Sequence, residues 1–74
     1  MDIKIKIGQR IKHLREQAQM SQKELSYAAD LDRSYVASVE NGNRNVSIIN
    51  IEKIAAALKI TLKDFFEDGE FDKY

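Results

Sequence analysis

SQKELSYAADLDRSYVASVENGNRN, residues 21–45, holds two short helical segments separated by a three-residue break. The first segment opens with Ser21 and Glu24, the spacing of a capping box, in which each side chain satisfies a backbone N–H left unpaired at a helix start. The break is Asp-Leu-Asp at 30–32, and the second segment stops at Gly42, the residue type favoured in the left-handed position after a helix. Two helices of about eight residues joined in this way are typical of a helix-turn-helix unit.

Helical periodicity continues on both sides of this unit. Upstream, an apolar stripe at helical spacing through Ile7, Ile11 and Leu14 predicts a helix that ends near Gln19. Three further helix starts are expected, with Asp32 capping residues 33–41, Ser47 capping residues 48–59, and Thr61 with Asp64 opening a short fifth helix. The side chains expected to face inward on the second to fourth helices are Leu25, Ala28, Ala29, Val36, Val39, Ile48, Ile51, Ile54, Ala55 and Leu58. Five short helices with tight links predict an all-α domain.

The N-terminal stretch IKIKI, residues 3–7, fits two structures. Its apolar and basic residues alternate with period two, as they would in an extended arm. Equally, Ile3 and Ile7 continue the helical stripe that follows. The residues leave arm and helix open as alternatives.

Length and composition exclude several classes of function. A chain of 74 residues forms one domain at most, and one without Cys has neither a disulfide framework nor a thiolate metal site. No apolar run is long enough for a signal peptide or a membrane span, so we expect a cytoplasmic protein with no membrane partner. No nucleophile has a base beside it, and His13 has no metal ligand at a suitable spacing. We therefore expect no enzyme activity, no cofactor, no metal and no small-molecule ligand.

Charge is distributed unevenly although the net charge is zero. Residues 1–15 carry five basic side chains against one acidic, and residues 66–74 carry four acidic side chains against one basic. The distribution of charge decides nucleic-acid binding more than the sum does. A charge dipole along the chain would let one end face an anion while the other stays away from it.

The third helix has a polar face made of small side chains. On a helical wheel, Val36 and Val39 mark its buried side, and the opposite side presents Ser34, Ala37, Ser38 and Asn41. Small residues let a helix approach another surface closely, and the major groove of DNA admits one helix. Arg33, in the first turn, is of the type that bonds guanine O6 and N7 with two parallel hydrogen bonds. This pattern favours DNA reading over an ordinary solvated face.

These residues resemble those of a known family. SQKELSYAADLDRSYVASVENGNRN is similar to the helix-turn-helix of Cro and phage repressors, and RSYVASVENGNRN with INIEKIAAAL is more similar still to controller proteins of restriction–modification systems. The resemblance covers roughly residues 7–66 and implies a compact, lambda repressor-like five-helix domain. It further implies a transcriptional regulator that binds an inverted-repeat operator in double-stranded DNA as a homodimer. Regulation of its own gene and of an endonuclease gene, with RNA polymerase as a possible partner, belongs to the same implication.

The resemblance also implies roles for particular positions. Base-reading is implied for Arg33, Ser34, Tyr35, Ala37 and Ser38, and phosphate contact for Ser21, Gln22, Asn43, Arg44 and Asn45. An ion pair between Arg15 and Glu40 would tie the first helix to the third and position the reading helix. Two positions depart from the family pattern, which commonly has Gly where this chain has Asp30 and Ala where it has Ser26. Asp tolerates the left-handed conformation and Ser is small, so the motif survives both changes.

The fifth helix carries more apolar surface than so short a segment needs for the core alone. We therefore expect part of it, comprising Leu62, Phe65 and Phe66, to form the dimer interface.

Two other functions remain open from the sequence. A phage-type repressor or an antitoxin is one, with the acidic tail EDGEFDKY, residues 67–74, as the segment that would grip a toxin. A helical protein-interaction module that never touches DNA is the other, and the zero net charge supports it.

Overall fold

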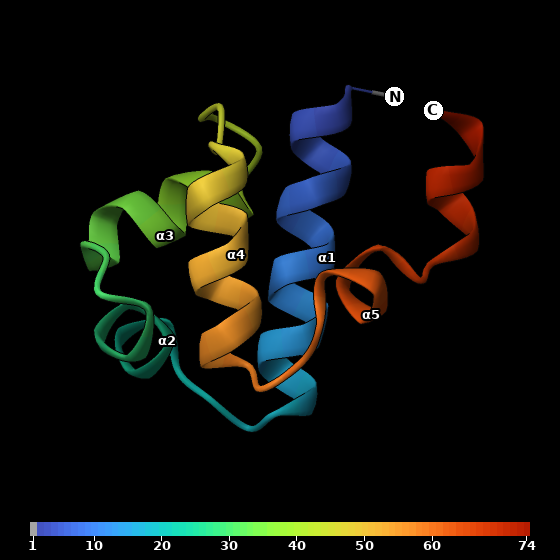
Figure 1. The fold of residues 1–74 in the computed structure, drawn as a ribbon. Helices are drawn as coiled ribbons and strands as arrows, with labels where there is room; N and C mark the ends of the chain where they lie inside the picture. The colour runs from blue at the N-terminus through green and yellow to red at the C-terminus, as the bar shows by residue number, and fades with distance from the viewer. Residues whose placement is uncertain (1) are drawn as a thin grey trace.

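The computed structural model describes residues 2–74 as a bundle of helices (Figure 1). The elements are α1 (Ile3–Gln17), α2 (Gln22–Ala29), α3 (Arg33–Glu40), α4 (Ile48–Ala57), α5 (Leu62–Phe66) and a final 3-10 helix, η1 (Gly69–Lys73). The described residues contain no strand. The predicted all-α, five-helix fold is therefore confirmed, with η1 as an addition.

Local side-chain caps start most of these helices. The capping box of α2 is present, because the Ser21 N–H donates to Glu24 Oε1 at 2.8 Å and the Glu24 N–H donates to Ser21 Oγ at 3.0 Å. Ser47 caps α4, and Thr61 forms a second capping box with Asp64 at the start of α5. Asp32 occupies the N-cap position of α3 as predicted, but its side chain accepts no capping hydrogen bond. The predicted side-chain cap of α3 is therefore wrong.

The N-terminal IKIKI stretch is helical and does not form an extended arm. Helix α1 begins at Ile3, and the side chain of Asp2 caps it by accepting the Lys4 N–H at 2.8 Å. The cap supplies an acceptor for a backbone group that the first turn leaves unpaired, and the apolar stripe continues into the core through Ile7.

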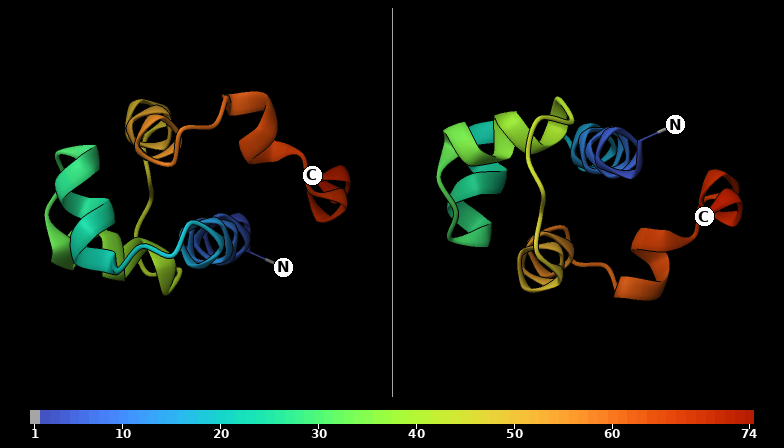
Figure 2. Two further views of the ribbon diagram at one scale, coloured as in Figure 1. Left: turned by 90° about the horizontal axis from the view of Figure 1, so that it is seen from below. Right: turned by 90° about the horizontal axis from the view of Figure 1, so that it is seen from above.

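The helices are arranged with α2 and α3 at one end and α5 and η1 at the other, as the views along the bundle show (Figure 2). Helices α1 and α4 lie between these ends. The core side chains that are almost completely buried are Ile11, Leu25, Val36, Val39, Ile54 and Phe65. Since both helices of the helix-turn-helix unit contribute to this core, the core fixes their mutual orientation.

Two residues expected in the core are exposed. Ile48, in the first turn of α4, is 62% exposed, and Ala28 lies on the exposed side of α2. Ser26 is buried instead of Ala28, and its hydroxyl donates to the Lys23 carbonyl at 2.8 Å. Both errors concern which side of a helix faces the core. The rotation of α2 and α4 about their axes turns Ala28 and Ile48 toward the surface.

The acidic tail packs against the basic N-terminal helix. Lys6 Nζ lies 2.7 Å from Asp68 Oδ2, and 5.2 Å from the centre of the Phe71 ring. The hydrogen bond from Lys6 is the largest cause of a pKa of Asp68 that lies below its ordinary value. Arg10 donates to the Phe65 carbonyl at 2.8 Å and to the Asp64 carbonyl at 2.9 Å. The two oppositely charged ends of the chain therefore meet, and the acidic tail neutralises part of the positive charge of α1.

Candidate nucleic-acid interface

The outward face of α3 is small and polar, as predicted. Val36 and Val39 are buried at 0% and 1% exposure, while Arg33 and Ser34 are exposed. Ala37 and Ser38 are partly exposed on the same helix. The face leaves room for a surface that approaches α3 closely, with Arg33 at the first turn.

Gly8 lets α1 approach the C-terminal turn of α3. It is a buried helical glycine, and a Cβ built on it would lie 2.7 Å from the Glu40 carbonyl oxygen and closer still to that of Val39. Real Cβ atoms essentially never come within 3.0 Å of such an atom. The glycine therefore permits backbone-to-backbone contact between the two helices, which sets the position of α3.

Glu40, at the end of α3, is hydrogen-bonded to side chains of both α1 and α2. Arg15 Nε donates to Glu40 Oε2 at 2.7 Å and Arg15 Nη2 donates to Oε1 at 3.1 Å, the two-bond geometry that suits guanidinium and carboxylate. Arg15 also donates to the Met20 carbonyl at 2.8 Å. The carboxylate is buried, with only 2% of the Glu40 side chain exposed, and its hydrogen bond raises the pKa of Arg15 above the ordinary value. The implied ion pair between the first and third helices is therefore present.

Gln22 also belongs to this cluster. Its side-chain amide donates to Glu40 Oε1 at 3.0 Å, so it links α2 to α3 as well as lying at the start of α2. Ser21, the other residue implied for phosphate contact at this helix end, uses its hydroxyl and its backbone N–H in the capping box. Part of the predicted phosphate-binding chemistry is thus already engaged in positioning the unit.

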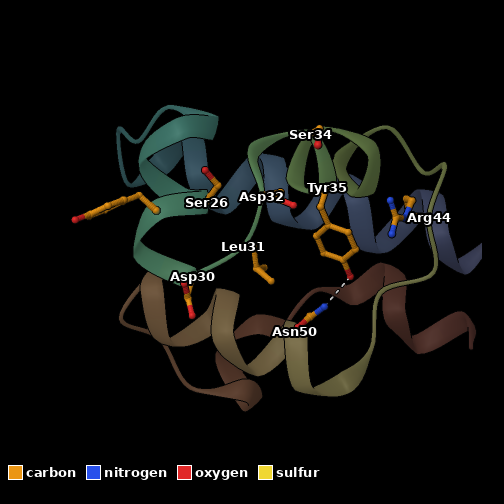
Figure 3. A pocket seen from close by; sticks show the side chains of 9 residues that line it. Ser26, Asp30, Leu31, Asp32, Ser34, Tyr35, Arg44 and Asn50 are labelled. Carbon is orange, nitrogen blue, oxygen red and sulfur yellow. Dashed lines mark hydrogen bonds between the residues drawn. The ribbon is translucent and has the colours of Figure 1, made fainter.

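Tyr35 connects α3 to α4 and to the loop between them (Figure 3). The Tyr35 hydroxyl accepts a hydrogen bond of 2.9 Å from Asn50 Nδ2, and the Arg44 guanidinium carbon lies 4.8 Å from the centre of the Tyr35 ring. Tyr35 is partly buried and packs against the core. Sequence reasoning placed Tyr35 at the base-reading face and missed Asn50, because the contact joins residues 15 apart in different helices.

The loop after α3 presents three exposed polar residues, namely Asn43, Arg44 and Asn45. Gly42 takes the left-handed conformation that the sequence predicted, with φ of 77°. The Asn43 N–H donates to the Ser38 carbonyl at 3.0 Å, which closes the helix end. The loop therefore leaves α3 in a fixed direction, and Arg44 returns beside α3 at the Tyr35 ring.

The turn between α2 and α3 borders an open groove of about 810 Å³ that extends to Arg44 and Asn50 (Figure 3). Asp30 closes the end of α2 in the left-handed conformation, with φ of 57° and ψ of 48°. Its backbone thus performs what Gly commonly performs in the family, as expected. Asp30 and Asp32 line this groove together with Ser34 and Arg44, so its lining carries charges of both signs.

Comparison with known proteins agrees with this arrangement. The family model described as helix-turn-helix matches residues 11–65. The control protein C.MunI of a Mycoplasma species is 51% identical over 70 residues, which are 93% of this chain and 95% of that protein. The chain belongs to the helix-turn-helix controller proteins. Members of this family are DNA-binding transcriptional regulators and not enzymes.

Solved structures of controller proteins share the fold. The restriction–modification controller protein C.AhdI from Aeromonas hydrophila is 48% identical, with a TM-score of 0.82 over 85% of this chain and 96% of that one. C.Esp1396I, solved as a tetramer in complex with its natural 35-base-pair operator, is 33% identical, with a TM-score of 0.85 over 90% of this chain and 88% of that one.

Only two of the three α5 residues predicted for the dimer interface are exposed. Phe65 is completely buried in the core and packs edge-to-face on Phe66 at 4.9 Å between ring centres. Phe65 is therefore a core residue, and its assignment to a dimer interface is wrong. Leu62 and Phe66 are each 36% exposed, so they are the large apolar side chains that α5 leaves at the surface.

Residues 2–74 contain neither a metal cluster nor a spanning helix. No group of three or more His, Cys, Asp or Glu side chains among them is placed to hold a metal ion. None of the helices described is long and apolar enough to cross a membrane.

Proposed function

We propose that this controller protein reads an inverted-repeat operator as a homodimer and regulates its own gene together with that of a restriction endonuclease. The observation that carries the proposal is the small polar face of α3, with exposed Arg33 in its first turn and the Glu40 cluster holding its last turn. A helix presented in this way suits the major groove, where arginine is the commonest reader of guanine.

In this proposal α3 makes the base contacts, while the loop after it and the start of α2 make the phosphate contacts. Arg33, Ser34 and Ser38 read base edges, with Ala37 close enough for a thymine methyl. Asn43, Arg44 and Asn45 hold the flanking phosphate groups, which supply affinity without sequence preference. Ser21 and Gln22 approach the phosphate backbone from the start of α2, where helix N–H groups favour an anion.

The dimer is proposed to form about α5. Leu62 and Phe66 lie partly exposed there, and an apolar pair of this kind suits a seam around a two-fold axis. Such an axis would place two α3 helices about 34 Å apart, so that both enter the major groove on one face of DNA. The relative C.Esp1396I, crystallised as a tetramer on its operator, supports assembly of this kind.

An antitoxin role is less well supported. That role would use the acidic tail to grip a toxin, but the tail residues Asp68 and Phe71 are engaged by Lys6.

Whether the bound protein activates or represses transcription follows from where the operator lies relative to RNA polymerase.

Arg33→Ala is expected to lose preference for one base pair in each half-site, by about 1–3 kcal/mol, without loss of fold. The arginine is exposed and forms no ion pair among residues 2–74, so the fold does not depend on it. Competition between operator duplexes that differ at each position measures the change, and circular dichroism checks the fold. A collapse of the thermal transition would show that Arg33 is structural and would contradict the assignment.

Arg44→Ala is expected to weaken binding to all sequences alike and to reduce the slope of log affinity against log salt by about one unit per subunit. The loop places this guanidinium beside the α3 face without an acidic partner among the described residues. Titrations at several salt concentrations measure the slope. A loss confined to particular sequences would mean that Arg44 reads bases.

A further inference from the structure

We propose that Asn50 is a positioning residue for DNA contact: from the first turn of α4 it fixes the Tyr35 ring, which in turn holds the Arg44 guanidinium beside the reading helix. The inference rests on the proposed DNA-binding function. It assigns a role to Asn50, a residue that the sequence pattern did not single out. Three linked contacts carry it, and Figure 3 shows the side chains of Asn50, Tyr35 and Arg44 that take part in two of them.

The first link is the anchoring of Asn50 itself. Its backbone N–H donates to the Ser47 hydroxyl at 3.0 Å, which fixes the residue in the capped first turn of α4. The side chain of Asn50 takes no part in this cap and reaches toward α3, where its amide donates to the Tyr35 hydroxyl at 2.9 Å. Within residues 2–74 this is the one side-chain hydrogen bond that joins α3 to α4.

The second link is the direction of the hydrogen bond at Tyr35, in which Asn50 is the donor and the Tyr35 hydroxyl the acceptor. A phenol hydroxyl has one proton to donate and lone pairs with which to accept. Because Asn50 is the donor here, the Tyr35 hydroxyl keeps its own proton for an acceptor elsewhere, such as a base edge or a phosphate oxygen. Asn50 thus restrains the ring without consuming the donor that DNA contact would need.

The third link is Arg44. The salt bridges among the described residues involve Lys4, Lys6, Arg10 and Arg15, and none of them includes Arg44. The Tyr35 ring, 4.8 Å from the guanidinium carbon, is what holds this loop side chain. Cation–π attraction orders an arginine while leaving its N–H donors free for a phosphate. Ordering the side chain before binding removes part of the entropy that association otherwise loses.

Asn50→Ala and Tyr35→Phe test the inference, because each removes the hydrogen bond and leaves the helix cap and the aromatic ring in place. Each is expected to weaken binding to a fluorescent operator duplex, selected from random DNA with the wild-type protein, by about fivefold to tenfold. The double variant is expected to lose no more than Tyr35→Phe alone, since that variant already removes the hydrogen bond that Asn50→Ala removes. Ile49→Ala, on the exposed neighbour of Asn50, is the matched control and is expected to leave affinity unchanged.

The arginine background separates positioning from general stability. In Arg44→Ala protein, Asn50→Ala is expected to cause little further loss of affinity, because the side chain that it positions is gone. An equal loss in both backgrounds would overturn the inference. Wild-type protein that enriches no DNA sequence would instead overturn the proposed function. Normal wild-type binding that falls with Arg44→Ala but not with Asn50→Ala would overturn this inference alone.

Discussion

Gly8→Ala is expected to lower the free energy of unfolding by about 3 kcal/mol or more, a large effect for the smallest possible substitution. In an ordinary helix position the same change stabilises by about 0.5–1 kcal/mol, since alanine has less backbone freedom to lose. Here the added Cβ meets the carbonyl oxygens of Val39 and Glu40, which are backbone atoms and cannot rotate away. Helix α3 would have to move away from α1.

Chemical denaturation monitored by circular dichroism measures this effect. Gly69→Ala is the matched control, because a Cβ at that position meets no atom within 4 Å. We expect the Gly69 variant to unfold at nearly the wild-type denaturant concentration. Gly8→Ala protein as stable as the wild type would contradict the close approach of α1 to α3.

Glu40→Ala is expected to cost about 3–5 kcal/mol, because it leaves a largely buried guanidinium without its carboxylate. The Arg15 side chain is 11% exposed, and Gln22 donates to the same carboxylate. Domains have about 0.05–0.15 kcal/mol of stability per residue, so this loss would unfold a substantial fraction of so short a chain. Thermal unfolding followed by circular dichroism measures it, with Glu52→Ala, on the exposed side of α4, as the control.

Replacing the whole pair distinguishes an uncompensated charge from a lost attraction. The double variant Arg15→Met, Glu40→Leu is expected to recover much of the stability lost by Glu40→Ala, since no buried charge remains. DNA binding is expected to recover less, because the pair also fixes the angle of α3 relative to α1. A double variant that is less stable than Glu40→Ala would show that attraction within the pair dominates.

Features set by neighbours in the chain could be predicted from the sequence. The capping boxes at Ser21 and Thr61 depend on residues three positions apart, and both formed as expected. The left-handed residue at Gly42 follows from residue type in the same local way. The ion pair of Arg15 with Glu40 spans 25 residues, and resemblance to a family, rather than local pattern, predicted it.

Features that depend on helix rotation and packing could not be predicted. The apolar stripe of α4 suggested that Ile48 is buried, but this side chain is 62% exposed at the start of the helix. The two Phe residues of α5 look alike in the sequence, yet Phe65 is core and Phe66 is partly exposed. Gly8 carried no local signal either, since its importance comes from a helix some 30 residues away.

The sequence predicted a charge dipole along the chain, but not which of its charges meet in the fold. Opposite charges at the two ends of a short chain attract each other, and Lys6 with Asp68 forms a 2.7 Å contact that closes the chain on itself. The linear sequence gives the charges but not which of them meet. Among residues 2–74, Arg33 and Arg44 are the arginines at or beside α3 that form no salt bridge, which leaves their charge for DNA.

Enrichment of random duplex DNA by the purified protein at about 0.15 M salt tests the central claim most directly, since phosphate contacts alone give little selectivity at that ionic strength. The account predicts an inverted repeat with half-sites about one helical turn apart, bound by one homodimer. Sedimentation of the protein with the enriched duplex would check the stoichiometry. Absence of any enriched sequence, from protein that is folded, would contradict the assignment of α3 as a reading helix.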